Sequence, residues 1–164
     1  MTDWEQHYLD EHTPWDKGEA APPLLDWLDA NPGRILGKLL SPGCGLGYDL
    51  RAIATVCPEA ELVGLEISPT AFDRAREFAV VGHERYKLGD LFDLPASMRG
   101  TFDWIWEHTC FCAIEPEMRD DYVEAVASAL KPRGQFLGVF YLNPYDDDHA
   151  PGGGPPHGCS PEEV

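Results

Sequence analysis

The stretch LLSPGCGLGYDL, residues 39–50, places glycines at alternate positions directly after an apolar run. That run, Ile35–Ser41, predicts a buried strand, and the residues that follow the glycines predict a helix. Glycine lets a backbone turn sharply and approach a ligand closely, so a binding crevice is expected at Gly43, Gly45 and Gly47. A dinucleotide fingerprint G-x-G-x-x-G would need its third glycine where Tyr48 stands, and the spacing therefore disfavours a bound pyrophosphate.

Four further apolar runs follow, separated by stretches with helix signals. The predicted strands are Glu61–Ile67, Arg85–Asp90, Phe102–Glu107 and Gln135–Leu142. A regular alternation of strand and helix is typical of an α/β fold in which helices cover both faces of a parallel sheet. The sequence therefore predicts a doubly wound parallel sheet.

Helix boundaries are also legible. Ser68 is placed to cap a helix whose first turn holds Pro69, where a missing N–H costs nothing. A helix over about Pro116–Leu130 is expected to end at KPRG, residues 131–134, because lysine suits the C-terminal dipole and proline with glycine stops the run. Two short helices are expected before the first strand, around Trp4–Glu11 and Pro23–Ala30.

Composition excludes several classes of function. The chain has 164 residues, 43% of them hydrophobic, and a net charge of −17, so it can bury a core but would be repelled by nucleic acid and by anionic membranes. No apolar run approaches the ~18 residues of a membrane span, and the N-terminus is acidic rather than basic and apolar. Five cysteines without even spacing suit a reducing compartment. We expect a cytoplasmic protein with no nucleic-acid or membrane partner.

Acidic side chains stand at the ends of the second and third predicted strands. Glu66 ends the second strand, at the place where an acid can accept both hydroxyls of a ribose. Asp90 ends the third strand, within plausible reach of an adenine amino group. Together with the glycine loop, these strand ends predict a nucleoside site, although polar residues in ordinary loops would produce the same pattern.

A likeness to a known family rests on five segments in order: LLSPGCGLGYDL, VGLEIS, GDLF, FDWIWEHTCFCAIEPEMRDDY and ALKPRG. They resemble the class I S-adenosylmethionine-dependent methyltransferases of the thiopurine methyltransferase superfamily. Within these segments CFCAIEPEMR, and later in the chain GGPPHG, are most similar to the halide and thiol methyltransferase branch. The resemblance implies a Rossmann-like sheet of strand order 3-2-1-4-5. It also implies that the last two strands of the usual seven are missing, so that the chain is C-terminally truncated, as a fragment or naturally.

The resemblance further implies one methyltransferase domain over residues 1–164. A cofactor-covering segment would occupy residues 1–33, and the Rossmann-like core residues 34–142. Residues 143–164 would form a loop rich in proline and glycine and the start of a helix, although their composition also fits a disordered linker.

Cofactor contacts are carried over by position. The resemblance implies S-adenosylmethionine as the cofactor, held by Trp4, Tyr8, Trp15, Gly43, Gly45, Gly47, Glu66, Ile67, Asp90, Leu91, Glu107 and His108. Tyr141 falls where the halide branch carries a tyrosine associated with substrate handling. A small-molecule methyl acceptor is the implied partner.

The motif EHTCFC, residues 107–112, allows several interpretations. A zinc site prefers C-x2–4-C spacing and four ligands, and beside Cys110 and Cys112 only His108 with Cys159 or His157 could complete the set, so we predict no metal. A metal-binding module built on His149, His157, Cys159 and the two cysteines is an alternative. The C-x-C spacing is also wrong for a redox pair, and both cysteines are expected to pack as small hydrophobes. His108 either takes a proton from an incoming thiol or only positions the cofactor.

The expected reaction is methyl transfer to a small soft nucleophile by in-line displacement, with a thiol, hydrosulfide, halide or related chalcogen species as acceptor. The sulfonium already activates its methyl group, so a desolvated soft anion needs no strong base. An N- or O-methyltransferase of the same fold, or a non-catalytic or impaired cofactor-binding fragment, remains an alternative. An unpaired edge at the fifth strand would also invite a homo-oligomer.

Overall fold

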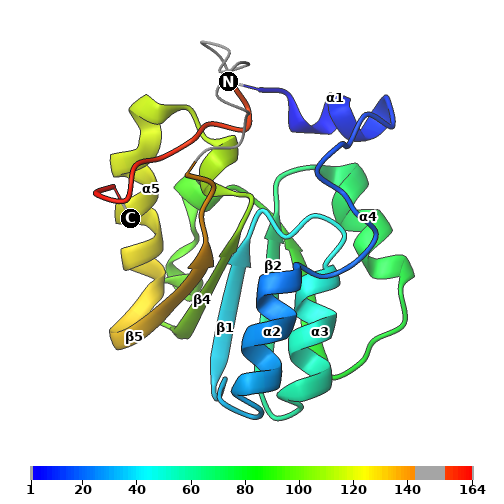
Figure 1. Cartoon of the computed structure of the whole chain (residues 1–164), viewed down its shortest axis with the longest axis vertical. Coiled ribbons are helices and arrows are strands. Elements are labelled where there is room, and N and C mark those ends of the chain that lie inside the picture. Colours follow the sequence, from blue (N-terminus) through cyan, green and yellow to red (C-terminus); the bar gives the residue numbers. More distant parts are fainter. Residues whose placement is uncertain (1, 143–153, 164) are drawn as a thin grey trace.

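The computed structural model describes residues 2–142 and 154–163. Its centre is a parallel sheet of five strands in the order β3-β2-β1-β4-β5 (Figure 1). The strands are β1 (Lys38–Pro42), β2 (Glu61–Glu66), β3 (His83–Leu88), β4 (Phe102–His108) and β5 (Leu130–Val139). The predicted α/β class and strand order 3-2-1-4-5 are confirmed.

Helices cover both faces of this sheet (Figure 1). One face carries α2 (Pro22–Ala30) and α3 (Tyr48–Val56), and α4 (Pro69–Glu77) connects β2 to β3. The other face carries α5 (Arg119–Ala129) and the 3-10 turns η1 (Leu91–Asp93) and η2 (Ala96–Met98). The short α1 (Trp4–Leu9) lies above the carboxyl ends of the strands. No helix in the described parts of the chain is long and apolar enough to span a bilayer.

The core has two layers because successive strand residues point to opposite faces of the sheet. Leu39 packs with α2 and α3, whereas its neighbour Leu40 packs with α5. The same alternation separates Trp104 from Ile105 on β4. Strands buried on both faces read as continuous apolar runs, and this is why β1, β2 and β4 were legible in the sequence.

The junction between α5 and β5 differs from the prediction. Residues 116–118 form a 3-10 turn, η4, before α5 begins, and α5 already ends at Ala129. The KPRG segment lies inside β5, opposite a register shift between Phe102 and Trp104 on β4, and its Arg133 has a φ of 70°. A bulged edge strand tolerates proline because one row of its backbone groups needs no partner. The predicted helix end and strand start at this junction were therefore wrong.

Residues 154–163 run back along η3 (Phe111–Ala113) and α5 (Figure 1). The His157 N–H donates to the carbonyl oxygen of Cys112 at 2.7 Å, which ties this segment to the loop after β4. The last described residues form one turn. The rest of the predicted proline- and glycine-rich loop, residues 143–153, lies outside the described residues.

Candidate functional site

The carboxyl ends of β1, β2 and β4 form the candidate site. In the observed strand order, the connection after β1 leads to one side of the sheet and the later strands are added on the other side. Open α/β sheets bind ligands at such a switch point, outside the carboxyl ends of the strands. The glycine loop follows β1, Glu66 ends β2, and His108 ends β4. The fold thus brings these predicted residues to one edge.

The glycine loop needs its glycines for two different reasons. Gly43, Gly45 and Gly47 all have positive φ, at 56°, 52° and 74°. A Cβ at Gly47 would lie 2.3 Å from the Tyr86 hydroxyl, so this glycine is required for packing. Within 4 Å, a Cβ at Gly45 would meet only the Tyr8 hydroxyl, at 3.2 Å. The loop backbone at Gly45 is therefore open toward the space beneath Tyr8.

Glu66 ties the end of β2 to this loop. Its Oε2 accepts a hydrogen bond from the Gly45 N–H at 2.8 Å, and its Oε1 accepts from the N–H groups of Ile67 and Ser68, both at 2.9 Å. Burial raises the pKa of Glu66, and the three backbone donors oppose that rise. A carboxylate offers about four acceptor positions, so one position is left for a ligand hydroxyl.

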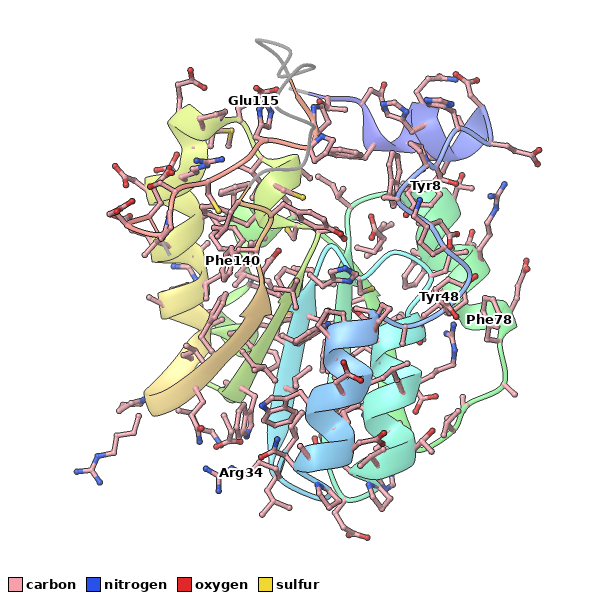
Figure 2. All side chains as sticks on the ribbon, viewed as in Figure 1. Tyr8, Arg34, Tyr48, Phe78, Glu115 and Phe140 are labelled. Atoms are coloured by element: carbon pink, nitrogen blue, oxygen red, sulfur yellow. The ribbon has the colours of Figure 1, made fainter. Side chains whose placement is uncertain are left out.

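The N-terminal segment closes over Glu66. The Glu5 carboxylate accepts hydrogen bonds from the hydroxyls of Ser68 and Thr70 at the start of α4. Tyr8 is buried between α1 and the body of the protein (Figure 2). Its hydroxyl accepts from the Trp15 indole at 3.3 Å, and burial, with the nearby charge of Glu66, raises the pKa of Tyr8.

The aromatic residues predicted in this segment form one cluster. The rings of Trp4 and Trp15 meet edge to face with centroids 5.3 Å apart, and the rings of Trp15 and Tyr8 are 5.9 Å apart. The structure therefore brings together Trp4, Tyr8 and Trp15 above the glycine loop. Sequence reasoning missed the contact of Glu5 with Ser68 and Thr70, which we call the N-terminal clasp, because these partners are distant from Glu5 in the chain.

Glu107 points away from this edge. It is 1% exposed, and its Oε1 accepts from the N–H groups of Cys110 and Phe111 at 2.9 and 2.8 Å. The hydroxyl of Tyr122, on α5, donates to its Oε2. Burial raises the pKa of Glu107, and these donors oppose that rise. This placement does not support the predicted cofactor contact through the Glu107 side chain, which instead fixes the loop after β4.

His108 faces the other side of β4 and meets Asp49. Its Nδ1 lies 3.0 Å from the Asp49 Oδ2, which also accepts from the Trp106 indole at 2.8 Å. The other oxygen, Oδ1, accepts from the Ala21 N–H at 2.7 Å. Burial alone would raise the pKa of Asp49, but the hydrogen bonds from His108, Ala21 and Trp106 outweigh burial and lower it.

Sequence reasoning missed Asp49. It lies in the helix predicted after the glycines, and nothing local in the sequence connects it to His108, 59 positions away. The available signal was topological. Asp49 follows the glycine loop after β1, His108 ends β4, and these two strands are neighbours in the predicted order.

The other residues predicted to contact the cofactor or the substrate differ in how exposed they are. Ile67 is 46% exposed beside Glu66 and can form an apolar wall. Asp90 accepts a hydrogen bond from the Phe92 N–H at 2.9 Å and caps η1. The Leu91 side chain is buried in the core layer below α5, so only its backbone is available to a ligand. Tyr141 follows β5 and is partly exposed.

The cysteines of the loop after β4 are thiols. All five cysteines of the chain are free. Burial raises the pKa of Cys112 to about 12 and that of Cys110 well above the usual thiol range, so both remain protonated at neutral pH. Within residues 2–142 and 154–163, no three potential ligands gather to hold a metal ion, and His149 lies outside those ranges. These placements support a packing role for the sulfur atoms.

The arrangement fits a ribose-bearing ligand with an apolar ring. Glu66 keeps one acceptor position for a hydroxyl. The backbone at Gly45 permits close approach, and the exposed Ile67 offers apolar surface beside Glu66.

Comparisons with known proteins agree with this geometry. The family described as "Thiopurine S-methyltransferase (TPMT)" matches residues 1–164. The thiocyanate methyltransferase 1 of Arabidopsis thaliana is 37% identical over 156 residues, covering 94% of this chain and 65% of the relative. A probable thiol methyltransferase 2 of the same plant is 33% identical over 164 residues, covering 98% of this chain and 68% of the relative. The chain thus spans about two thirds of the length of these curated relatives.

Solved structures support the fold. A structure from work on the conversion of a disulfide bond into a thioacetal group during echinomycin biosynthesis superposes with a TM-score of 0.72 at 24% identity, covering 85% of this chain and 59% of that one. A Burkholderia thailandensis 1,6-didemethyltoxoflavin-N1-methyltransferase, solved with bound S-adenosylhomocysteine, superposes with a TM-score of 0.64 at 19% identity. It covers 85% of this chain and 60% of that one.

Proposed function

The chain belongs to the thiopurine S-methyltransferase family, and on this premise we propose that it transfers a methyl group from S-adenosylmethionine to a small soft nucleophile. Thiols, hydrosulfide, halides and related chalcogen species form the acceptor class. The observation that carries the proposal is the Glu66 carboxylate, held by Gly45 across the crevice and covered by Tyr8. The names of the relatives, which refer to thiocyanate and thiol acceptors, support the choice of acceptor.

Several residues would hold the cofactor. Glu66 would accept a ribose hydroxyl, because it is the buried carboxylate with a free acceptor position at this edge. The adenine would lie beside Ile67, near Asp90 and the Leu91 backbone. The amino-acid end would lie on the loop at Gly43, Gly45 and Gly47.

The protein would contribute positioning and the exclusion of water. When bound, S-adenosylmethionine would supply an activated methyl group. The lone pair of the acceptor would form the new bond to the methyl carbon, and the electrons of the broken carbon–sulfur bond would stay on the sulfur of the cofactor. The cluster of Trp4, Tyr8 and Trp15 provides aromatic faces that favour a cation and an apolar cover that strips water from a soft anion. Holding two reactants in line can remove about 7–11 kcal/mol from a barrier, so few further catalytic groups are needed.

A direct assay tests this function. The purified chain is incubated with S-adenosylmethionine and, in turn, methanethiol, hydrosulfide and iodide, and methylated products are measured in the headspace. We expect product from at least one acceptor, and at least a tenfold lower rate from Glu66→Gln at subsaturating cofactor. Binding of S-adenosylhomocysteine without any turnover would instead favour a non-catalytic cofactor-binding protein, and turnover only with amine or hydroxyl acceptors would favour an N- or O-methyltransferase.

We also propose a reducing, cytoplasmic setting. Five free thiols support this setting, since closely spaced cysteines would tend to form disulfides in an oxidising compartment. The net charge of −17 supports a small-molecule acceptor over nucleic acid, because a phosphate backbone would be repelled.

Self-association through β5 is a further part of this proposal. Among the described residues β5 pairs with β4 alone, and Phe136 in the second half of β5 is 41% exposed. Lys131 and Pro132 protect the first half of the strand against pairing, so a second chain would join the later half. Sedimentation velocity should show a dimer in the wild type that Phe136→Lys dissociates. A monomeric wild type would contradict this part of the proposal.

A further inference from the structure

Asp49 is fully engaged at the switch point between β1 and β4. Its two oxygens accept hydrogen bonds from a backbone N–H of Ala21, the Trp106 indole and the His108 ring. The Ala21 N–H and the Trp106 indole N–H can only donate hydrogen bonds, and they therefore hold the carboxylate in one orientation. The side chains of His108 and Asp49 are 23% and 16% exposed, so the pair lies at the wall of the crevice, partly shielded from water.

This geometry fixes the tautomer of His108. The lowered pKa of Asp49 keeps its carboxylate ionised, and an ionised carboxylate can only accept hydrogen bonds. At a separation of 3.0 Å the proton must therefore lie on the His108 Nδ1. In the neutral ring this leaves a lone pair on Nε2, which is the atom that can accept a proton.

The Nε2 atom is available. Among the residues that the structure describes, no group is hydrogen-bonded to the His108 Nε2, and the His108 side chain is 23% exposed. Within residues 2–142 and 154–163, the carboxylates that interact with His108 are Asp49 on α3 and Glu107 beside it on β4, and Tyr141 after β5 senses the charge of Asp49. Glu107 is turned to the α5 side and bonded there, and Tyr141 is held neutral because burial and the charge of Asp49 raise its pKa.

We propose that Asp49 positions His108 so that its Nε2 removes the proton of a thiol or of hydrogen sulfide, and that this pair makes protonated sulfur acceptors the preferred substrates. The inference rests on the proposed methyl transfer and specifies its acceptor. The acceptor S–H bond breaks and leaves its electron pair on sulfur, the proton moves to Nε2, and the sulfur lone pair forms the new bond to the methyl carbon. The imidazolium later releases the proton to solvent.

Iodide and thiocyanate carry no proton at neutral pH, and they provide the internal control. A base contributes nothing to their methylation, whereas it typically contributes 100-fold or more when a proton must move. The ratio of the thiol rate to the iodide rate therefore reports the base separately from cofactor binding and folding.

The first test measures this ratio at pH 7 for the wild type, His108→Gln and Asp49→Asn. We expect the ratio to fall roughly 100-fold in His108→Gln and at least tenfold in Asp49→Asn, whatever either variant does to cofactor binding, because that effect is common to both acceptors. Raising the pH above the thiol pKa should restore the thiol rate of both variants, since the acceptor then ionises by itself. Asp103→Asn, at the opposite end of the sheet, is the matched control and should leave the ratio unchanged. An unchanged ratio in His108→Gln and Asp49→Asn overturns the proposal.

The second test needs no turnover. Nitrogen NMR of the protein labelled at its six histidines, with the His108 signals identified from His108→Gln, reports which ring nitrogen carries the proton. We expect the Nδ1–H form in the wild type and a shift toward Nε2–H in Asp49→Asn. The Nε2–H form in the wild type would overturn the proposal. Absence of methylation of every acceptor, with the Nδ1–H form observed, would refute the proposed methyl transfer and leave the Asp49–His108 pairing supported.

Discussion

The ends of β2 and β4 carry the same residue type and use it in opposite ways. Glu66 and Glu107 are both buried acids that accept hydrogen bonds from the N–H groups of the loops that follow them. Glu66 uses its second oxygen to bridge to Gly45, across the candidate crevice. The second oxygen of Glu107 is bonded to Tyr122 on α5. One carboxylate therefore shapes the candidate site, and the other fixes the core.

The difference follows from the alternation of side chains along a strand. On β2, Glu66 shares a face with Leu62, which packs under α2 and α3. On β4, Glu107 shares a face with Ile105, which packs toward α5. His108 shares the first face with Trp106 and so reaches Asp49. A shift of one residue along the strand decides which acid can meet a ligand.

The largest expected effect is at Glu107. Glu107→Leu leaves the Tyr122 hydroxyl and the N–H groups of Cys110 and Phe111 without acceptors in the core. We expect the free energy of unfolding in urea to fall by about 3–5 kcal/mol. Tyr122→Phe, which removes a single donor, should cost about 1–3 kcal/mol. Full stability of Glu107→Leu would show that this carboxylate does not support the core.

The next effect is at Glu66. Glu66→Gln replaces one oxygen by an NH2 group that faces the Gly45 N–H or competes with the ligand hydroxyl. We expect the dissociation constant for S-adenosylhomocysteine to rise by about 10- to 100-fold, because hydrogen bonds to a charged group contribute about 1.5–3 kcal/mol. The matched Glu107→Gln, if folded by circular dichroism, should change affinity by less than about threefold. Equal losses of affinity in the two variants would remove the distinction between the two strand ends.

Asp49 should show a pH dependence opposite in sign to that of the two glutamates. Its pKa is lowered in the fold, so its contribution to stability is present above its unfolded pKa of about 3.9 and is lost as pH falls through the folded value. The raised pKa values of Glu66 and Glu107 make stability fall as pH rises through their titration. We expect the wild type to exceed Asp49→Asn by about 1–2 kcal/mol at pH 6 and by much less near pH 2. Urea unfolding at both pH values measures this, and a pH-independent difference would contradict it.

The smallest expected effect is at the N-terminal clasp. Glu5→Ala removes the acceptor of the Ser68 and Thr70 hydroxyls, and both bonds lie at the surface. We expect faster hydrogen exchange over residues 4–15 and about a three- to tenfold weaker affinity for S-adenosylhomocysteine. Asp10→Ala, at the C-cap of the same helix, is the control and should change neither. Unaltered exchange in Glu5→Ala would mean that the aromatic cluster alone holds the segment.

The sequence predicted the sheet mainly because β1, β2 and β4 are buried apolar runs between glycine and proline signals. The same signals predicted a helix end at KPRG, which was wrong, because lysine, proline and glycine are equally compatible with a helix end and with a bulged edge strand. Local signals also placed Glu66 and the glycine loop correctly at one edge. The period-two alternation, applied to β4, would have separated Glu107 from His108, which were predicted together. Contacts between distant segments, such as Asp49 with His108, depend on packing that no local pattern reports.

Glu66, the glycine loop and Tyr8 would together form the cofactor site. Calorimetric titration of the wild-type chain with S-adenosylhomocysteine tests this directly, because the product binds without an acceptor. We expect saturable binding with a stoichiometry near one. A folded sample that produces no binding heat at several temperatures and shows no shift in its thermal unfolding would contradict it.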